Sequence, residues 1–292
     1  CKALADGGLP VAEITFRSDA AKQAIQNVHE ALPEVLLGAG TVLTIQQVDE
    51  AIEAGAGYIV SPGFNAEVVA YCVEKNIPIV PGCSTPSDIE KALSLGITTV
   101  KFFPAEASGG LAMIKAMSAP YGQVRFVPTG GINEKNVNAY LAHPSIVACG
   151  GSWMVPEEAV KAKNWEKITL LAKEAVNTIL QFSLAHIGIN SENSQDAKRT
   201  ASLLTSLLLL PERETSKSTF VGASFEIMHG KGPGEKGHIV IGTSSVDRAI
   251  WHMEKRGFTF DDTTAKKDEK GEHTFIYLKD EIAGFGIHLI KA

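Results

Sequence analysis

Between Leu9 and Trp153 the chain alternates strand-like and helix-like segments, and this alternation leaves few folds open to it. Short apolar runs suited to buried strands are separated by amphipathic segments, three of which begin at the helix-capping residues Thr44, Asn65 and Thr85. Strands joined through helices run parallel, because each helix carries the chain back to the starting edge of the sheet. The pattern therefore predicts an α/β fold, either a doubly wound sheet or a barrel. The expected strands are Val11–Phe16, Val35–Gly40, Tyr58–Pro62, Pro78–Pro81, Thr98–Phe103, Arg125–Thr129 and Ile146–Gly150.

The ends of these strands favour the barrel. Polar or glycine residues follow every expected strand, as in TIM-type (β/α)8 barrels, whereas a doubly wound sheet concentrates such residues at one crevice. Seven strands are expected where a closed barrel needs eight, and the residues from Cys1 to Gly8 are typical of a helix end with a glycine cap. We therefore expect a TIM-type barrel that lacks its first strand in this chain. A gap should lie between Val11–Phe16 and Ile146–Gly150.

A change of pattern after Ser183 predicts a second domain. A helix expected from Pro156 to Phe182 ends the barrel domain, residues 1–182. Residues 183–292 contain two strand openings of similar sequence, Ala-His-Ile-Gly-Ile at 185–189 and Gly-His-Ile-Val-Ile at 237–241, each followed by a helix and further strands. This weak repeat indicates a smaller α+β domain of paired β-α-β-β modules. Its expected strands are Leu184–Ile189, Phe220–Met228, His238–Gly242, Thr274–Leu278 and Gly286–Ile290, with helices near Ser194–Leu210 and Val246–Arg256.

Composition and charge exclude several classes of partner. The formal net charge is −6, which gives no basic surface for a nucleic acid as the main partner. The longest apolar run, Leu203–Leu210, is too short to span a bilayer, and it predicts a buried helix and no membrane anchor. The four cysteines are scattered without a Cys-x-x-Cys pair. This usage indicates reduced thiols in a cytoplasmic protein.

Charged side chains in the middle of two expected strands point to chemistry. Strand alternation places Glu13 and Arg17 on one face of the first strand and places Lys101 centrally in the fifth. Packing alone does not explain these residues, because barrel strands are buried on both sides. A desolvated lysine has a lowered pKa, as an amine needs in order to attack a ketone near neutral pH. Two interpretations stay open: a nucleophilic Lys101, or a Lys101 that reaches the rim beside a Glu13–Arg17 ion pair.

Two glycine pairs follow the last two expected strands. They lie in Pro-Thr-Gly-Gly-Ile at 128–132 and in Cys-Gly-Gly-Ser at 149–152. In barrels, backbone amides at these strand-to-helix turns commonly bind phosphate groups. A Gly-Gly pair also makes a tight turn without any ligand. Two pairs at neighbouring strands indicate an anion site more specifically than either pair alone.

Seven motifs occur in order and cover essentially all of residues 1–156. They are Glu-Ile-Thr-Phe-Arg (13–17), Gly-Ala-Gly-Thr-Val (38–42), Ile-Val-Ser-Pro-Gly (59–63), Pro-Gly-Cys-Ser-Thr-Pro (81–86), Val-Lys-Phe-Phe-Pro-Ala-Glu (100–106), Pro-Thr-Gly-Gly-Ile (128–132) and Gly-Gly-Ser-Trp (150–153). Together they resemble the 2-keto-3-deoxy-6-phosphogluconate (KDPG) / 4-hydroxy-2-oxoglutarate (KHG) aldolase family. The resemblance implies a class I aldolase, a lyase of Entner–Doudoroff carbohydrate metabolism that needs no cofactor and assembles as a trimer. The missing first strand departs from the family pattern and bears on the stability of the barrel more than on its chemistry.

The resemblance also implies a role for individual residues. Lys101 would form a Schiff base with the substrate ketone, and Glu13 would shuttle protons through water. KDPG would be cleaved to pyruvate and glyceraldehyde 3-phosphate, and KHG, as a further substrate, to pyruvate and glyoxylate. The implied substrate contacts are Arg17 and Thr41 for the pyruvate carboxylate, Pro62 and Phe103 for the pocket walls, and Gly130, Gly131, Gly151 and Ser152 for the phosphate.

The two modules of the second domain share histidine-containing openings and have the closings Phe-Glu-Ile-Met (225–228) and Ile-His-Leu-Ile (287–290). Together these openings and closings resemble the glyoxalase/vicinal-oxygen-chelate fold. In that family metal ligands come from the first and last strands of each module, which implies His186, Glu226, His238 and His288 here. Three imidazoles and a carboxylate suit zinc, nickel or iron. A metal-free module with hydrogen-bonded strand histidines is the alternative.

The leading hypothesis is therefore an aldolase that acts on a phosphorylated keto acid and associates with copies of itself. One alternative is a bifunctional protein whose second domain has a metal-dependent activity like that of glyoxalases or dioxygenases. Another is a second domain without catalysis, which senses a metabolite or mediates oligomerisation.

Overall fold

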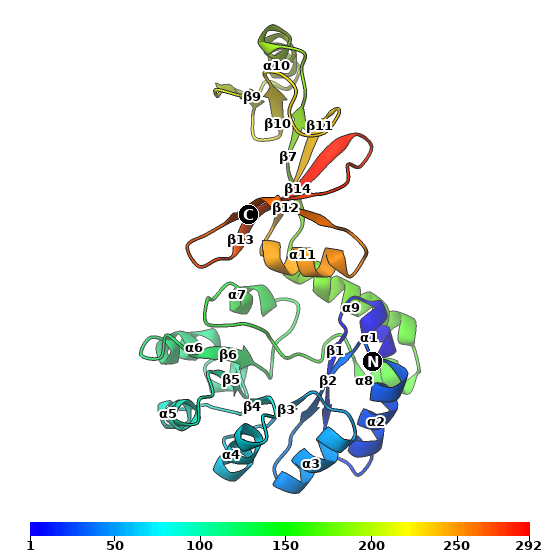
Figure 1. Cartoon of the computed structure of the whole chain (residues 1–292), viewed down its shortest axis with the longest axis vertical. Helices are drawn as coiled ribbons and strands as arrows, with labels where there is room; N and C mark the ends of the chain where they lie inside the picture. Colours follow the sequence, from blue (N-terminus) through cyan, green and yellow to red (C-terminus); the bar gives the residue numbers. More distant parts are fainter. The chain divides into compact units, whose positions relative to one another are not determined.

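The computed structural model describes residues 1–292 and divides them into two compact units (Figure 1). The first unit is Cys1–Ile179 and the second is Leu180–Ala292. Each unit has its own strands and its own buried core.

Parallel strands form the centre of the first unit. Strands β1 (Val11–Thr15), β2 (Leu36–Gly40), β3 (Tyr58–Val60) and β4 (Ile79–Val80) pair in this order, and β5 (Thr99–Phe102) pairs with β6 (Arg125–Pro128). A parallel bridge between Gly82 and Lys101 links the end of β4 to β5. The helices lie outside these strands, as Figure 1 shows for α2 to α6. They are α1 (Lys2–Asp6), α2 (Ala21–Ala31), α3 (Ile45–Glu53), α4 (Ala66–Glu74), α5 (Pro86–Ser94), the 3-10 turn η1 (Glu106–Ser108), α6 (Gly110–Ser118), α7 (Val137–Leu141), α8 (Glu157–Lys161) and α9 (Trp165–Leu180).

Strand pairing leaves the ring of the first unit open. Strand β1 pairs with β2 alone. The segment expected to form a seventh strand, 146–150, makes only two isolated bridges, Phe126 to Ile146 and Thr129 to Gly150. A regular strand was therefore the wrong prediction there. The segment has β6 on one side and no paired strand on the other. The backbone groups on its second side therefore have no strand with which to form hydrogen bonds.

Three helices of the first unit begin at the capping residues that the sequence predicts. Thr44 and Asn65 accept hydrogen bonds from backbone N–H groups at the starts of α3 and α4. Thr85 forms a full capping box with Asp88 at the start of α5. These caps fix the residues at which α3, α4 and α5 begin, so the loops that follow β2, β3 and β4 are short and end at defined positions.

The single helix expected from Pro156 to Phe182 is two helices, α8 and α9. Lys163 has a positive φ of 52°, which breaks the helical path. The side chain of Asn164 then accepts a hydrogen bond from the N–H of Lys167 at 3.0 Å and starts α9. None of the helices in the chain is both long and apolar enough to cross a membrane.

The second unit is built on one eight-stranded sheet with the order β12-β13-β14-β11-β7-β10-β9-β8. Each half has the same internal order, so β7 and β11 are equivalent, and they pair antiparallel in the middle. The elements are β7 (Ser183–Ile189), α10 (Ser194–Leu208), β8 (Glu212–Glu214), β9 (Ser218–Val221) and β10 (Phe225–Met228), then β11 (Gly237–Thr243), α11 (Val246–Glu254), β12 (Phe260–Lys267), β13 (His273–Leu278) and β14 (Phe285–Lys291).

Each module therefore has four strands and one helix, β-α-β-β-β, which corrects the expected β-α-β-β pattern. The run from Phe220 to Met228 is a hairpin, because Gly222 takes a left-handed turn with φ of 59° between β9 and β10. Strands β8 and β12 are rich in charged residues and lie at the two edges of the sheet, so they lack the apolar alternation that marks a strand.

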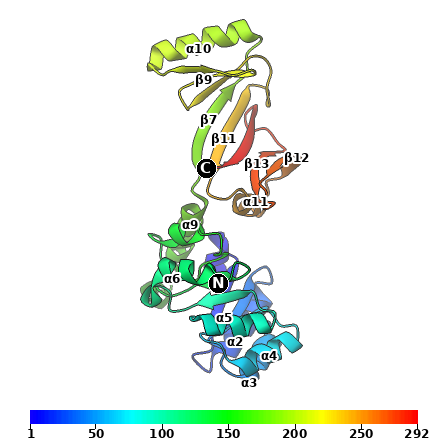
Figure 2. The ribbon, with the colours of Figure 1, turned by 90° about the vertical axis from the view of Figure 1, so that its left-hand side faces the viewer.

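Helix α10 packs on one face of the sheet through small residues, and Figure 2 shows it lying along β9. Ala197 and Ala201 form a core with Val221 and Ile227. The leucine run was predicted to be buried, and this prediction was wrong. Leu207 is 76% exposed, because the alanines occupy the side of α10 that faces the sheet. Strand alternation places Glu226, next to Ile227, on the other face of the sheet.

Replacing Gly188 by alanine should destabilise the second unit by about 1–3 kcal/mol, because overpacking a filled region costs this much. Gly188 on β7 pairs with His238 on β11, and an added Cβ would overlap the His238 ring. Gly230→Ala is the matched control, since nothing lies within 4 Å of a Cβ built there. Urea unfolding of both variants measures the effect. Equal midpoints would contradict this packing.

Candidate active site

Lys101 lies in the middle of β5 and is almost fully buried, with a side chain that is 8% exposed. Its backbone is held on both sides. Its N–H donates to the carbonyl of Pro81 at 2.8 Å, its carbonyl accepts from the N–H of Cys83 at 2.8 Å, and it pairs with Val127 on β6. The amine therefore projects from a fixed point of the backbone.

Glu13 is the acidic partner of this amine. Oε1 of Glu13 lies 3.7 Å from Nζ of Lys101, and the Glu13 side chain is 31% exposed. The ring of Phe103 lies 5.3 Å from the same Nζ. Arg17 does not pair with Glu13, since its Nε donates instead to Oγ1 of Thr15 at 3.1 Å. The structure thus has a buried amine with one carboxylate beside it, and the hypothesis of a lysine at the rim is wrong.

Glycines on β2 make the space for this pair. A Cβ on Gly40 would overlap the Glu13 carboxylate, and a Cβ on Gly38 would overlap the ring of Tyr58. The hydroxyl of Tyr58 donates to the carbonyl of Ala12 at 3.3 Å. Burial and the negative charge of Glu13 raise the pKa of Tyr58 to about 12, so this neighbour stays neutral. Tyr58 was missed in the sequence, although its position in the strand pattern could have placed it inside.

The other expected contact residues follow β1, β2 and β3, three adjacent strands. Arg17 is exposed just beyond β1, Thr41 follows β2 with a positive φ of 57°, and Pro62 follows β3, partly buried. All three residues lie at the carboxyl-terminal ends of their strands. Because the strands are parallel, the carboxyl-terminal end of β5, which carries Lys101, lies on the same side. None of these three residues bonds directly to Lys101, whose side chain contacts Glu13 and Phe103.

The two glycine turns lie next to each other, because Thr129 bridges to Gly150. Gly130 and Gly131 have φ values of 97° and 83°, which other residues adopt only with strain. The side-chain amides of Asn133 and Asn136 both donate to the carbonyl of Gly131, at 3.1 and 3.0 Å. This carbonyl is therefore held, and the N–H groups of Gly130, Gly131 and Gly151 have no acceptor within the protein. Ser152 is exposed beside them.

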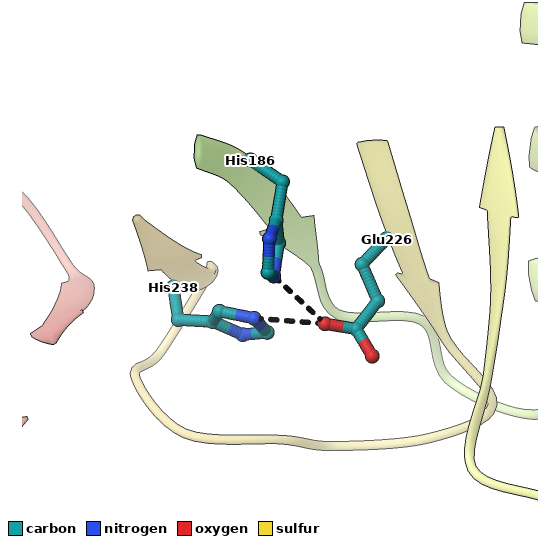
Figure 3. A group of neighbouring side chains, drawn as sticks. All are labelled: His186, Glu226 and His238. Atoms are coloured by element: carbon teal, nitrogen blue, oxygen red, sulfur yellow. Dashed lines mark hydrogen bonds and ion pairs between the residues drawn. The ribbon is translucent and has the colours of Figure 1, made fainter. Parts of the chain in front are cut away.

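A separate polar cluster of three side chains, His186, Glu226 and His238, lies in the second unit (Figure 3). It lies on the sheet face opposite α10, because Glu226 alternates with Ile227, which packs against that helix. Nε2 of His186 on β7 and Nε2 of His238 on β11 each lie 3.1 Å from Oε2 of Glu226 on β10. Oγ of Ser218 donates to the other carboxylate oxygen at 2.6 Å. The hydrogen bonds from His186 and His238 hold the pKa of Glu226 well below its usual range. Three side chains with ligand atoms within 4.8 Å of one another could hold a metal ion.

His288, the fourth residue of the expected metal set, lies beside this cluster and is not a member of it. Its ring centroid is 5.4 Å from that of His238 and 4.5 Å from those of Phe275 and Tyr277. Burial lowers the pKa of His288 to about 3, so the ring is neutral, and its Nδ1 is buried without a hydrogen-bond partner. The strand pairings make it the equivalent of Glu226: Glu226 pairs two residues beyond His186, and His288 pairs two residues beyond His238.

The geometry of the first unit defines a class of enzyme. The unit has a buried primary amine next to a carboxylate, and free backbone amides lie at the ends of its parallel strands. These features are typical of a lyase that works through a Schiff base.

The chain belongs to the KDPG and KHG aldolase family, whose model matches residues 1–171. It is 48% identical over 178 residues to the 2-dehydro-3-deoxy-phosphogluconate aldolase of Treponema pallidum, covering 61% of this chain and 85% of that protein. The Haemophilus influenzae protein of the same name is 51% identical over 176 residues, covering 60% and 83%. The KDPG aldolase structure of Legionella pneumophila, which holds pyruvate as a covalent carbinolamine intermediate, is 42% identical with a TM-score of 0.58, covering 60% and 84%.

Gly40→Ala should lower aldolase turnover by about 10²-fold, because misplacing a reacting group by 1 Å can cost that much. The added methyl would occupy the position of the Glu13 carboxylate. Gly57→Ala is the control on a neighbouring segment, since its Cβ would make only ordinary contacts, at 3.5 Å from Leu36. Steady-state pyruvate release measures both. Full activity in folded Gly40→Ala would show that Glu13 needs no such space.

Proposed function

We propose that this chain cleaves KDPG to pyruvate and glyceraldehyde 3-phosphate, with Lys101 as the nucleophile. One observation carries the proposal: the Lys101 amine is buried and lies 3.7 Å from the only acidic group that contacts it, Glu13. A primary amine at this position can add to a ketone, and the carboxylate beside it can take and return protons. The names of the relatives support KDPG as the substrate.

In this mechanism the Lys101 amine adds to the C2 ketone and forms a carbinolamine, which loses water to give an iminium ion. The C4 hydroxyl then loses its proton as the C3–C4 bond breaks. The bond electrons move into the iminium, which leaves an enamine and releases the aldehyde. Glu13 moves protons between these groups, and it protonates the enamine at C3. Hydrolysis releases pyruvate and regenerates the amine. The Legionella pneumophila enzyme, with its pyruvate carbinolamine, supports the first intermediate.

The strand ends supply the contacts that hold the substrate. Arg17 and Thr41 bind the carboxylate, since a guanidinium matches a planar carboxylate with paired hydrogen bonds. Pro62 and Phe103 form the walls next to the amine. The phosphate is bound by the free N–H groups of the two glycine turns and by a hydroxyl, at Gly130, Gly131, Gly151 and Ser152.

The same chemistry extends to KHG, whose cleavage gives pyruvate and glyoxylate. This reaction uses the amine and the carboxylate contacts and needs no phosphate. No cofactor takes part in either cleavage. The chain would act as a homotrimer, in line with the family resemblance.

We also propose that the second unit is a glyoxalase/vicinal-oxygen-chelate-like module that binds a divalent metal through His186, Glu226 and His238. Two imidazoles and one carboxylate form a donor set that suits zinc, nickel or iron, and their ligand atoms lie within 4.8 Å of one another. The hydrogen bond from Ser218 fixes the carboxylate, as partners behind metal ligands commonly do. Three protein ligands leave coordination positions open, where a bound metal could polarise an oxygen of a small molecule.

The decisive test of the aldolase proposal is covalent trapping. Incubation with pyruvate and borohydride should add a reduced pyruvate group to the peptide that contains Val100-Lys101-Phe102, read by mass spectrometry. Lys101→Ala and Lys101→Arg should lose both the adduct and turnover, because a guanidinium stays protonated and cannot add to a ketone. Lys91→Arg, at an exposed position of α5, is the control and should keep both the adduct and turnover. Folded protein without an adduct, or an adduct at another lysine, would refute this mechanism.

Metal content tests the second proposal. Purified chain should carry near-stoichiometric metal that a chelator removes, and removal should lower the unfolding midpoint of the second unit, because a ligand that binds only the folded state stabilises it. His186→Ala should abolish binding. His273→Ala is the control, since Nδ1 of His273 also contacts a carboxylate, Asp247, at 2.5 Å outside the cluster. Metal-free protein that takes up none of the three metals would favour the non-catalytic module.

A further inference from the structure

A glutamate covers the glycine turn that is proposed to bind phosphate. The N–H of Glu106, in η1, donates to the carbonyl of Gly130 at 3.1 Å. A Cβ built on Gly131 would lie 2.5 Å from Cγ of Glu106. The methylene groups of Glu106 therefore occupy the space beside Gly131, and only glycine leaves room for them.

The carboxylate of this residue is held by a tyrosine from the core. Oε1 of Glu106 accepts a short hydrogen bond from the hydroxyl of Tyr140, which lies in α7 and is 2% exposed. A Cβ on Gly110, at the start of α6, would lie 3.2 Å from the same Oε1. Burial and the negative charge of Glu106 raise the pKa of Tyr140, so its hydroxyl keeps its proton. The carboxylate thus sits by Tyr140 and Gly110, with its methylenes on Gly131.

The position of this charge matters to any anion on the turn. The carbonyls of Gly130 and Gly131 are occupied by Glu106 and by the two asparagine amides, while the N–H groups of the turn are free. A carboxylate that could rotate toward those N–H groups would compete for them. It would also repel a phosphate dianion at short range.

We propose that Tyr140 is a positioning residue for phosphate binding: its hydroxyl holds the Glu106 carboxylate away from the free amides of the Gly130–Gly131 turn and so makes the site selective for phosphorylated substrates. The inference rests on the phosphate position in the proposed function. It adds a role for two residues that touch neither the substrate ketone nor Lys101.

The first test separates phosphate binding from Schiff-base chemistry. Tyr140→Phe should raise the inhibition constant of glycerol 3-phosphate and the KM for KDPG about tenfold, which corresponds to one hydrogen bond to a charged group. Exchange of pyruvate methyl protons in heavy water needs no phosphate, and its rate should stay unchanged. Tyr121→Phe is the matched control, because Tyr121 donates to Glu90 at 2.9 Å in a second tyrosine–glutamate pair of the same unit.

A double variant separates positioning from structural support. Glu106→Gln removes the negative charge that Tyr140→Phe would release, so the double variant should return the inhibition constant of glycerol 3-phosphate to the wild-type value. A raised constant that persists in the folded double variant would overturn the inference, and so would a wild-type constant in Tyr140→Phe. If glycerol 3-phosphate fails to inhibit the wild-type chain, the phosphate position itself is wrong, while borohydride trapping still reports on Lys101.

Discussion

The burial of the Lys101 amine determines which residues can surround it in the first unit. An ammonium in the middle of a barrel strand is costly to bury unless a carboxylate or a change of protonation compensates it. Glu13 supplies the carboxylate, and its side chain fits only because Gly40 has none of its own. Tyr58 fills the neighbouring space as a neutral group. The Lys101–Glu13 pair thus needs a glycine at position 40 of β2, and the parallel strands hold both residues in place.

Local signals made much of this site predictable from the sequence. The caps at Thr44, Asn65 and Thr85 are short-range chemistry, and the structure has all three. Strand alternation singled out Glu13 and Lys101 as charged residues in buried strands but left two interpretations open, and only the family resemblance implied that the two residues act together. The pair of Glu106 and Tyr140 was not predicted, since two helical segments 34 residues apart must pack before it exists.

The errors lie where a local pattern is overruled or absent. Strands β8 and β12 lie at the edges of the sheet and pair through their backbone on one side only. They are rich in charged residues and lack an alternating apolar pattern, so the sequence did not predict them. The leucines of α10 were expected to be buried because they are hydrophobic. Instead Ala197 and Ala201 form the face of α10 that packs closely on the sheet, and the leucines lie elsewhere on the helix. The helix break at Lys163 depends on one residue with a left-handed backbone conformation, and a lysine gives no signal of this in the sequence.

The order of strands in the second unit has a consequence for how that unit is assembled. His186 and Glu226 belong to one module and His238 to the other, and they meet across β7 and β11, the only seam between the halves. Neither half can build the cluster alone, and a shift of the seam by one residue would turn His238 to the opposite face. The geometry of the three side chains therefore reports the register in which the two halves pair.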